Sequence, residues 1–345
     1  MRRTRVTVMG AGSIGCYLGG WLAATADVTL IGRPSVIDAI ERDGLTVTDL
    51  RGGTRTTPPE SLTLATDPSA VVGSDYVLMT TKTIDIEHTT AMVAPYLQYD
   101  SVLVSFQNGL RNASAIDEAL STSFTSRASR PLVLSGMVPF NLVRASETHW
   151  QQTVSGRIRV KDHPRIDPFI RAADTAGLHI GVEPDMRAIL FGKLLLNLNN
   201  AINALTGLPL AVELRDRDCR IVLAACQDEA LALARRIGTP VSRMTPLPPA
   251  LVPTILRAPT PVFEKLSSAS LKVSPQARSS MADDLERGRG TEIDELQGAV
   301  VALGEIHGSP TPVCTRIVEL VREAETAGPD RRPWTGTQLR RAVGL

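Results

Sequence analysis

The stretch Arg5-Val6-Thr7-Val8-Met9-Gly10-Ala11-Gly12-Ser13-Ile14-Gly15, near the beginning of this 345-residue chain, decides its fold. A strand-like run ends at Gly10, the next residues fit the pattern G-x-G-x-x-G, and a helix-like segment over 16–24 follows. In such a strand–turn–helix, the first glycine makes the tight turn and the second lets the backbone approach a pyrophosphate. The third glycine lets helix and strand pack closely, and the helix N-terminus offers N–H donors to phosphates. The stretch therefore predicts dinucleotide binding at Gly10–Gly15 rather than a purely structural turn.

Apolar runs of strand length recur along the first half of the chain, separated by helix-length stretches. This is the pattern of βαβ units in a parallel sheet. The main runs are Val6–Met9, Val28–Ile31, Tyr76–Met79, Val102–Phe106 and Leu132–Met137. Further strands are expected at Leu45–Thr48, Leu62–Ala65, Thr153–Val160 and Leu178–Val182. We therefore expect an α/β Rossmann domain over residues 1–183.

After Pro184 the strand patterns almost vanish. Helical patterns follow at Asp185–Leu205, Val212–Ile237, Ile293–His307 and Cys314–Glu325. Seven prolines between Pro240 and Pro261 predict a loop or a set of broken helices there. We expect an all-α domain over residues 184–345, with the active site in the cleft between the two domains.

Composition excludes several classes of function. Lys and Arg total 37 against 36 Asp and Glu, and aromatic residues make up 4%, which argues against nucleic acid as a partner. No apolar run approaches the roughly 18 residues needed to cross a bilayer, and no signal peptide is recognisable, so we expect a cytoplasmic protein with no membrane partner. The four cysteines form no C-x-x-C pair and the five histidines no H-x-x-x-H pair, so no metal site is expected. The sequence does not fix the oligomeric state, and it is compatible with a homodimer.

Residues after the predicted strands indicate the cofactor. An NAD enzyme usually carries Asp or Glu about 20 residues after the glycine loop, where it binds the ribose 2′-OH. Here the second strand is followed by Gly32-Arg33, and a guanidinium can bind a 2′-phosphate with two hydrogen bonds. We therefore predict NADPH/NADP+ as the cofactor. Lys82 and Asn108 follow the next two strands, at the edge where ligands bind in open α/β sheets, although Asn108-Gly109 is also a common turn dipeptide.

The predicted helix Asp185–Leu205 carries a narrow polar face. At about 100° per residue, with Lys193 at zero, Asn197 falls near +40° and Asn200 near −20°. In one interpretation the asparagines bond to other helices and the lysine extends to solvent. In the other, Lys193 protonates the alkoxide that hydride reduction of a ketone leaves, because burial lowers a lysine pKa toward neutrality, and the amides orient the substrate. Glu292, later in the chain, fits the first turn of a helix without any further role.

With these residues assembled, the chain resembles the ketopantoate reductase (2-dehydropantoate 2-reductase) family from the glycine loop to about Val321. The most specific parts are the K-x-x-x-N step of Lys193 and Asn197, and Ser280 followed by Thr291-Glu292-Ile293-Asp294. The resemblance implies reduction of 2-dehydropantoate, a small 2-keto acid, to (R)-pantoate with NADPH in pantothenate and coenzyme A synthesis. Lys193 would be the general acid, Asn197 a substrate-binding amide and Ser280 a hydroxyl for the substrate carboxylate.

On the cofactor side, the resemblance implies that Lys82 and Glu292 contact the dinucleotide. Arg33 would bind its 2′-phosphate, in agreement with the independent argument above. Asn108 would touch both cofactor and substrate.

Two departures from the family pattern bear on the substrate. The family has a second asparagine eight residues after the lysine, where this chain has Ala201, so Asn200 or Asn203 would have to serve instead. Another family asparagine, in the turn after that helix, has no match in Pro209-Leu210-Ala211-Val212. A reductase of another 2-keto acid or of a specialised-metabolite ketone is therefore the alternative. A non-catalytic NADP(H)-binding sensor is a further one, although a sensor needs no proton donor such as Lys193.

Overall fold

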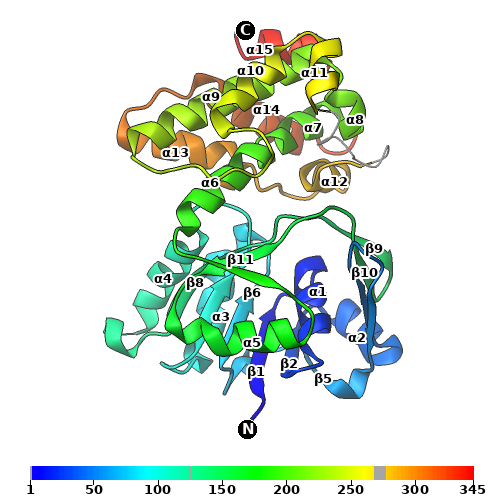
Figure 1. The fold of residues 1–345 in the computed structure, drawn as a ribbon, viewed down its shortest axis with the longest axis vertical. Helices are drawn as coiled ribbons and strands as arrows, with labels where there is room; N and C mark the ends of the chain where they lie inside the picture. Colours follow the sequence, from blue (N-terminus) through cyan, green and yellow to red (C-terminus); the bar gives the residue numbers. More distant parts are fainter. Residues whose placement is uncertain (1, 125, 268–276) are drawn as a thin grey trace. The chain divides into compact units, whose positions relative to one another are not determined.

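The computed structural model describes residues 2–124, 126–267 and 277–345. The chain divides into two compact units, Met1–Met186 and Arg187–Leu345, where the sequence predicted a boundary after residue 183. Figure 1 shows strands and helices in the first unit and helices in the second. The predicted fold class, an α/β Rossmann domain followed by an all-α domain, is confirmed.

An eight-stranded sheet forms the centre of the first unit, in the order β12-β11-β8-β7-β6-β1-β2-β5. Its strands are β1 Thr4–Met9, β2 Ala26–Ile31, β5 Leu62–Ala65, β6 Tyr76–Met79, β7 Val102–Ser105, β8 Leu132–Met137, β11 Ile158–Lys161 and β12 Ile180–Glu183. Neighbouring strands are parallel, except that β11 pairs antiparallel with β8. The order reverses direction at β1, since β2 lies on one side of it and β6 on the other.

A second sheet, of order β4-β3-β10-β9, packs against the first helix of the same unit. Its strands are β3 Leu45–Thr48, β4 Thr54–Thr57, β9 Leu142–Ser146 and β10 His149–Gln152. The predicted strand Thr153–Val160 is confirmed only at its end, because β10 ends before it and β11 begins at Ile158. The segment between them contains Gly156, where a Cβ would come within 2.5 Å of the Pro139 ring. The segment thus packs closely on Pro139.

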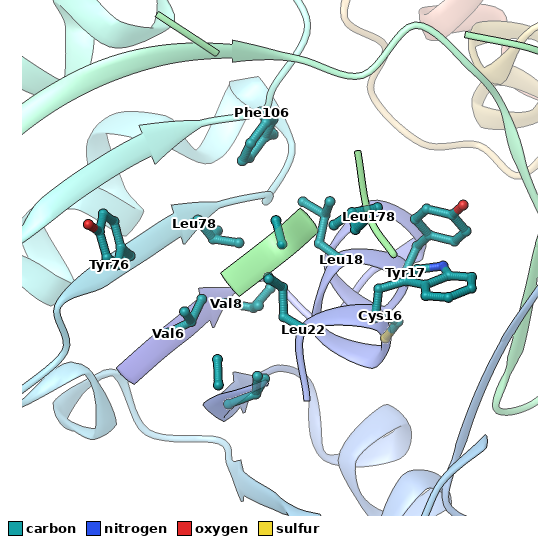
Figure 2. Close-up of a cluster of buried hydrophobic side chains, with 14 of the residues drawn as sticks. Val6, Val8, Cys16, Tyr17, Leu18, Leu22, Tyr76, Leu78, Phe106 and Leu178 are labelled. Carbon is teal, nitrogen blue, oxygen red and sulfur yellow. The ribbon is translucent and has the colours of Figure 1, made fainter. Parts of the chain in front are cut away.

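Alternate residues of the central strands face opposite layers of helices. Val6 and Val8 of β1 belong to an apolar cluster with α1 (Ser13–Leu22), α2 (Pro34–Asp43) and α5 (Asp167–Thr175), part of which is drawn in Figure 2. Val77 and Met79 of β6 belong to another cluster with α3 (Ile86–Val93) and α4 (Asn112–Ser123). Because both faces of the sheet are covered, its strands are continuous apolar runs, and the sequence therefore revealed them.

The second unit is built from helices in the residues that the structure describes. They are α6 Met186–Asn197, which begins at the unit boundary, α7 Asn199–Thr206, α8 Leu210–Glu213, α9 Arg217–Arg236, α10 Val252–Arg257, α11 Thr260–Ser267, α12 Ser280–Glu286, α13 Gln297–His307, α14 Pro312–Ala327 and α15 Gly336–Ala342. The proline-rich segment contains both of the predicted forms: residues 240–248 are a loop, and the 3₁₀ turn Pro249–Leu251, α10 and the start of α11 follow as short helices.

Two of the predicted long helices are interrupted. Asp185–Leu205 breaks at Leu198, between α6 and α7. Val212–Ile237 is wrong as one helix, because α8 ends at Glu213 and the Asp216 carboxylate accepts the N–H groups of Asp218 and Cys219 to begin α9. The carboxylate cap therefore starts a new helix where the apolar spacing alone continues the old one.

The segment Met186–Thr206 is long and apolar enough to cross a bilayer by length and composition, which the sequence analysis did not expect. However, 72% of its most apolar 18-residue window is buried in the protein, so it is accounted for as a core helix.

Candidate active site

The glycine loop has the geometry that its pattern predicts. Gly10 has φ +114°, and a Cβ there would lie 2.7 Å from the Thr81 nitrogen. A Cβ on Gly15 would lie 2.1 Å from the Gly10 oxygen, so only glycine lets α1 pack this closely on β1. Beside Gly12, which precedes the first turn of α1, no atom lies within 4 Å of where a Cβ would be. The loop therefore leaves open space at the N-terminus of a ten-residue helix, which fits the pyrophosphate of a dinucleotide.

Three more of the predicted cofactor residues lie at the same edge of the sheet, whereas the fourth, Glu292, belongs to the second unit. Arg33 follows β2, Lys82 follows β6 and Asn108 follows β7, and these strands are parallel to β1 or to one another in matched register. Ligands bind at this carboxyl edge where the strand order reverses, which here is β1. Arg33 is exposed and makes no ion pair with the described residues. Its guanidinium is therefore available to a phosphate.

Two of these loops are tied together by Gln107, which the sequence analysis did not single out. The Gln107 amide donates to the Thr81 hydroxyl (3.2 Å) and to the Lys82 carbonyl (3.4 Å). The Asn108 carbonyl in turn accepts from the Thr83 hydroxyl (3.0 Å) and from the Asn112 amide. Lys82 and Asn108 are thus held by one hydrogen-bonded network, and a turn at Gly109 (φ +112°) accompanies it.

In the second unit, Lys193 and Asn197 lie one turn apart on α6, as the helical spacing of about 100° per residue predicts. Asn200 lies beyond the break, on α7. The break coincides with two helix carbonyls that accept side-chain amides: Leu195 from Gln227 (2.9 Å) and Leu198 from Gln297 (2.7 Å).

Two side chains of this polar face, Asn197 and Asn200, are only partly buried. The amides of Asn197 and Asn200 are half-buried and make no hydrogen bond with the residues described in the structure. Ala201 is completely buried, so the position of the family's second asparagine faces the core here. Of the positions compared on this helix pair, Asn197 and Asn200 are thus the partly exposed amides, and they remain the candidates for a substrate contact.

The surroundings of Lys193 shift the pKa of its ammonium toward neutrality. Burial of its ammonium lowers the pKa from 10.5 to about 8, and the Glu292 carboxylate acts against this shift. Glu292 is half-buried and precedes the short 3₁₀ turn Ile293–Glu295. The structure thus brings Glu292 within electrostatic reach of Lys193, which the sequence could not show.

Ser280 is the first residue of α12 and its side chain is exposed. The neighbouring Ser279 is buried and caps α12 by accepting the Ala282 N–H (3.1 Å). The Asn203 amide oxygen accepts the Ser279 N–H (2.9 Å), and the Asn203 side chain is completely buried. Asn203 therefore supports the segment ahead of Ser280 rather than contacting a substrate, which leaves Asn200 as the candidate.

An apolar pocket with about 280 Å³ of space, part of it open to solvent, lies against α6 and the proline-rich segment. It is lined by Gly192, Leu195, Leu196, Gln227, Ser242, Met244, Thr245, Leu247, Pro249 and Val252. None of the predicted site residues lines it, so it does not mark the substrate site. Within the described ranges, no three His, Cys, Asp or Glu side chains are grouped to hold a metal ion.

Comparison with known proteins assigns the class of the chain. The family model "Ketopantoate reductase PanE/ApbA" matches residues 6–165, and its C-terminal counterpart matches residues 185–325. A 2-dehydropantoate 2-reductase of Halobacterium salinarum is 30% identical over 94% of this chain and 100% of its own length. Together with the dinucleotide loop, these matches define a nicotinamide-dependent oxidoreductase.

Solved structures agree with this assignment. A PanE/ApbA-family ketopantoate reductase from Ralstonia eutropha is 28% identical, with a TM-score of 0.79 over 94% of this chain and 99% of its own. A D-mandelate dehydrogenase with NADH and anilino(oxo)acetate shares the fold at 18% identity, with a TM-score of 0.75 over 94% of this chain and 99% of its own. The chain belongs to the ketopantoate reductase family.

Proposed function

We propose that this protein reduces 2-dehydropantoate to (R)-pantoate with NADPH, as a cytosolic step of pantothenate synthesis. The observation that carries the proposal is Lys193, whose pKa is lowered to about 8 by burial, one helical turn from the open amide of Asn197. A donor with this pKa is still protonated at neutral pH and gives up its proton more readily than an ordinary lysine.

The first unit would hold the dinucleotide. The N–H groups at the start of α1 and the open space at Gly12 suit the pyrophosphate, and Lys82 and Asn108 lie at the same sheet edge. Arg33, exposed after β2 with no acidic residue at Gly32 or Pro34, favours a 2′-phosphate and hence NADPH over NADH. The nicotinamide, when bound, supplies the hydride.

The second unit would hold the keto acid and manage its proton. Lys193 donates a proton to the oxygen of the C2 carbonyl as negative charge develops there, which avoids a free alkoxide. The amides of Asn197 and Asn200 orient the substrate without adding charge, and the Ser280 hydroxyl donates to its carboxylate. Glu292 keeps the Lys193 pKa from falling further, so the ammonium stays charged before each turnover.

A different 2-keto acid is the second candidate substrate. Ala201 is buried and Asn203 bonds internally, so one amide of the family pattern is displaced to Asn200. The relative that shares the fold and binds anilino(oxo)acetate is a D-mandelate dehydrogenase, which acts on another 2-hydroxy acid. A substrate site with its second amide at Asn200 rather than at position 201 can favour a 2-keto acid of another shape.

The test is NADPH oxidation at 340 nm with 2-dehydropantoate beside a panel of 2-keto acids, including benzoylformate, and with NADH in place of NADPH. We expect turnover on 2-dehydropantoate with NADPH to give the highest kcat/KM. A higher kcat/KM on another keto acid would reassign the substrate. NADPH binding, measured by its fluorescence, without turnover on any keto acid would favour the sensor.

A further inference from the structure

A buried carboxyl group, Glu213 of α8, is joined by hydrogen bonds to the segment that precedes Ser280. The Asn203 amide donates to Glu213 Oε2 (2.5 Å), and its oxygen accepts the Ser279 N–H (2.9 Å). Glu213 is 1% exposed and Asn203 completely buried. Asn203 thus lies between a carboxyl of α8 and the residue next to Ser280.

Glu213 helps to fix which way the Asn203 amide points. The two N–H bonds of Asn203 Nδ2 are directed at Glu213 and at the Leu208 carbonyl (2.8 Å). With acceptors on that side, only the oxygen is left to face the Ser279 N–H. A rotated amide would set its NH₂ group against the Ser279 N–H, donor against donor, so the acceptors at Glu213 and Leu208 select the productive orientation.

The same segment is tied to α7 and α8 at further points. The Leu210 N–H donates to the Ala277 carbonyl (2.9 Å), and the Ser279 hydroxyl donates to the Asn200 carbonyl (3.1 Å). The second of these bonds joins Ser279, the residue before Ser280, to the backbone of Asn200. The position of the Ser280 hydroxyl relative to Asn200 therefore depends on this network.

An ionisable side chain at this place needs an explanation beyond packing. Burial raises the pKa of Glu213 from 4.5 to about 8, so the group is mostly neutral at pH 7. The hydrogen bonds from Asn203 and Asn199 act against this rise in pKa, and the charge of Asp216 adds to it. A leucine would fill a similar volume at no cost in desolvation. What a leucine cannot supply is an acceptor for Asn203.

We propose that Glu213 is a positioning residue for the substrate-carboxylate site, which acts through Asn203 and Ser279 on Ser280 and Asn200. The inference rests on the proposed function, because it takes Ser280 and Asn200 as the residues that hold the keto acid. Glu213 itself touches no substrate.

The experiment compares E213Q and E213L in the full-length protein with a matched control, E229L. Glu229 of α9 is a half-buried carboxylate with a structural task, since it accepts the N–H groups of Val313 and Cys314. E213L should raise the KM for 2-dehydropantoate, or for the best keto acid of the panel, about tenfold, with the KM for NADPH changed less than twofold. E213Q keeps an acceptor for Asn203 and should stay within about threefold of wild type. E229L should lower the melting temperature and leave both KM values unchanged.

Two further measurements separate positioning from general destabilisation. Hydrogen exchange of the Ser279 amide should speed up in E213L and not in E213Q. In the S280A background, E213L should raise the keto-acid KM by less than threefold, because the two changes act on one contact. If E213L does not fold, E213D takes its place, since its shorter side chain withdraws the acceptor and should give the same KM increase.

The outcomes distinguish the two proposals. If the wild type uses a 2-keto acid but E213L and E213D leave its KM unchanged, or raise the KM for NADPH equally, the inference about Glu213 is overturned alone. If S280A leaves the keto-acid KM unchanged, the assignment of Ser280 fails and the inference fails with it. If the wild type neither binds nor reduces any 2-keto acid of the panel, the proposed function falls.

Discussion

Replacing Lys193 by arginine or alanine tests the proposed acid directly. With a pKa of about 8, the lysine loses its proton as pH rises through that value, so kcat for keto-acid reduction should fall tenfold per pH unit above it. Oxidation of pantoate needs the unprotonated amine and should rise through the same range. K193A should lose about 10²–10⁴ in kcat, or about 3–5 kcal/mol of transition-state stabilisation, because a positioned acid contributes that much.

Variants at Lys193 and Glu292 should change the alkaline decline of kcat in defined directions. K193R keeps a charge that does not titrate below pH 12, so its residual reduction should show no alkaline decline. Glu292 raises the pKa of Lys193, so E292Q should move the wild-type decline to lower pH. Both are measured as kcat at saturating NADPH between pH 6 and 10, following absorbance at 340 nm, so that a cofactor contact of Glu292 does not enter the result.

K265A is the matched control, since Lys265 is an exposed lysine of α11. Its profile should overlay that of the wild type, and K193A should bind NADPH normally by fluorescence. An alkaline decline that persists in K193R, or wild-type turnover by K193A, would refute the role of Lys193 as the acid.

Three further changes test other parts of the structure. Arg33→Ala should raise the KM for NADPH at least about tenfold and leave that for NADH within twofold, because one charge-assisted contact is lost; equal changes for both cofactors would exclude a 2′-phosphate contact. Gly192→Ala should destabilise the protein by about 1–3 kcal/mol in urea denaturation, because its Cβ would lie 2.3 Å from the Ser242 carbonyl oxygen; an unchanged midpoint would contradict this close packing. Between about pH 4.5 and pH 8, Glu213 keeps its proton in the folded protein, whereas the unfolded chain has lost it. As pH rises across that window, this group therefore lowers the free energy of unfolding by up to about 1.4 kcal/mol per pH unit. E213Q should remove this part of the slope, and parallel wild-type and E213Q curves would be inconsistent with the raised pKa.

The sequence predicted those parts of the fold whose burial is fixed by neighbours in the chain. The strands at Tyr76–Met79 and Leu132–Met137 have the predicted bounds, because a strand covered on both faces is a continuous apolar run. The glycine loop could be interpreted residue by residue, because each glycine there meets a specific steric limit.

A helix break that coincides with a contact from a distant part of the chain could not be predicted from the sequence. The break at Leu198 coincides with a hydrogen bond from Gln297, which lies 99 residues further along the chain. The α6–α7 region still looks like one continuous helical pattern in sequence, because local spacing carries no information about such a partner. The break lies between Lys193 and Asn200, so the angle between these two side chains could not be predicted from the spacing of one continuous helix.

The choice between Asn200 and Asn203 shows what the structure adds to the candidate site. Both asparagines are candidates by spacing from Lys193. Exposure separates them, because Asn203 is completely buried with its amide bonded on both sides, whereas Asn200 is half-buried with an open amide. A buried amide with all its hydrogen bonds made has nothing left to offer a ligand. We therefore assign the proposed substrate contact to Asn200, and we assign to Asn203, which is hydrogen-bonded to Glu213 and Ser279, the role of holding the segment that precedes Ser280.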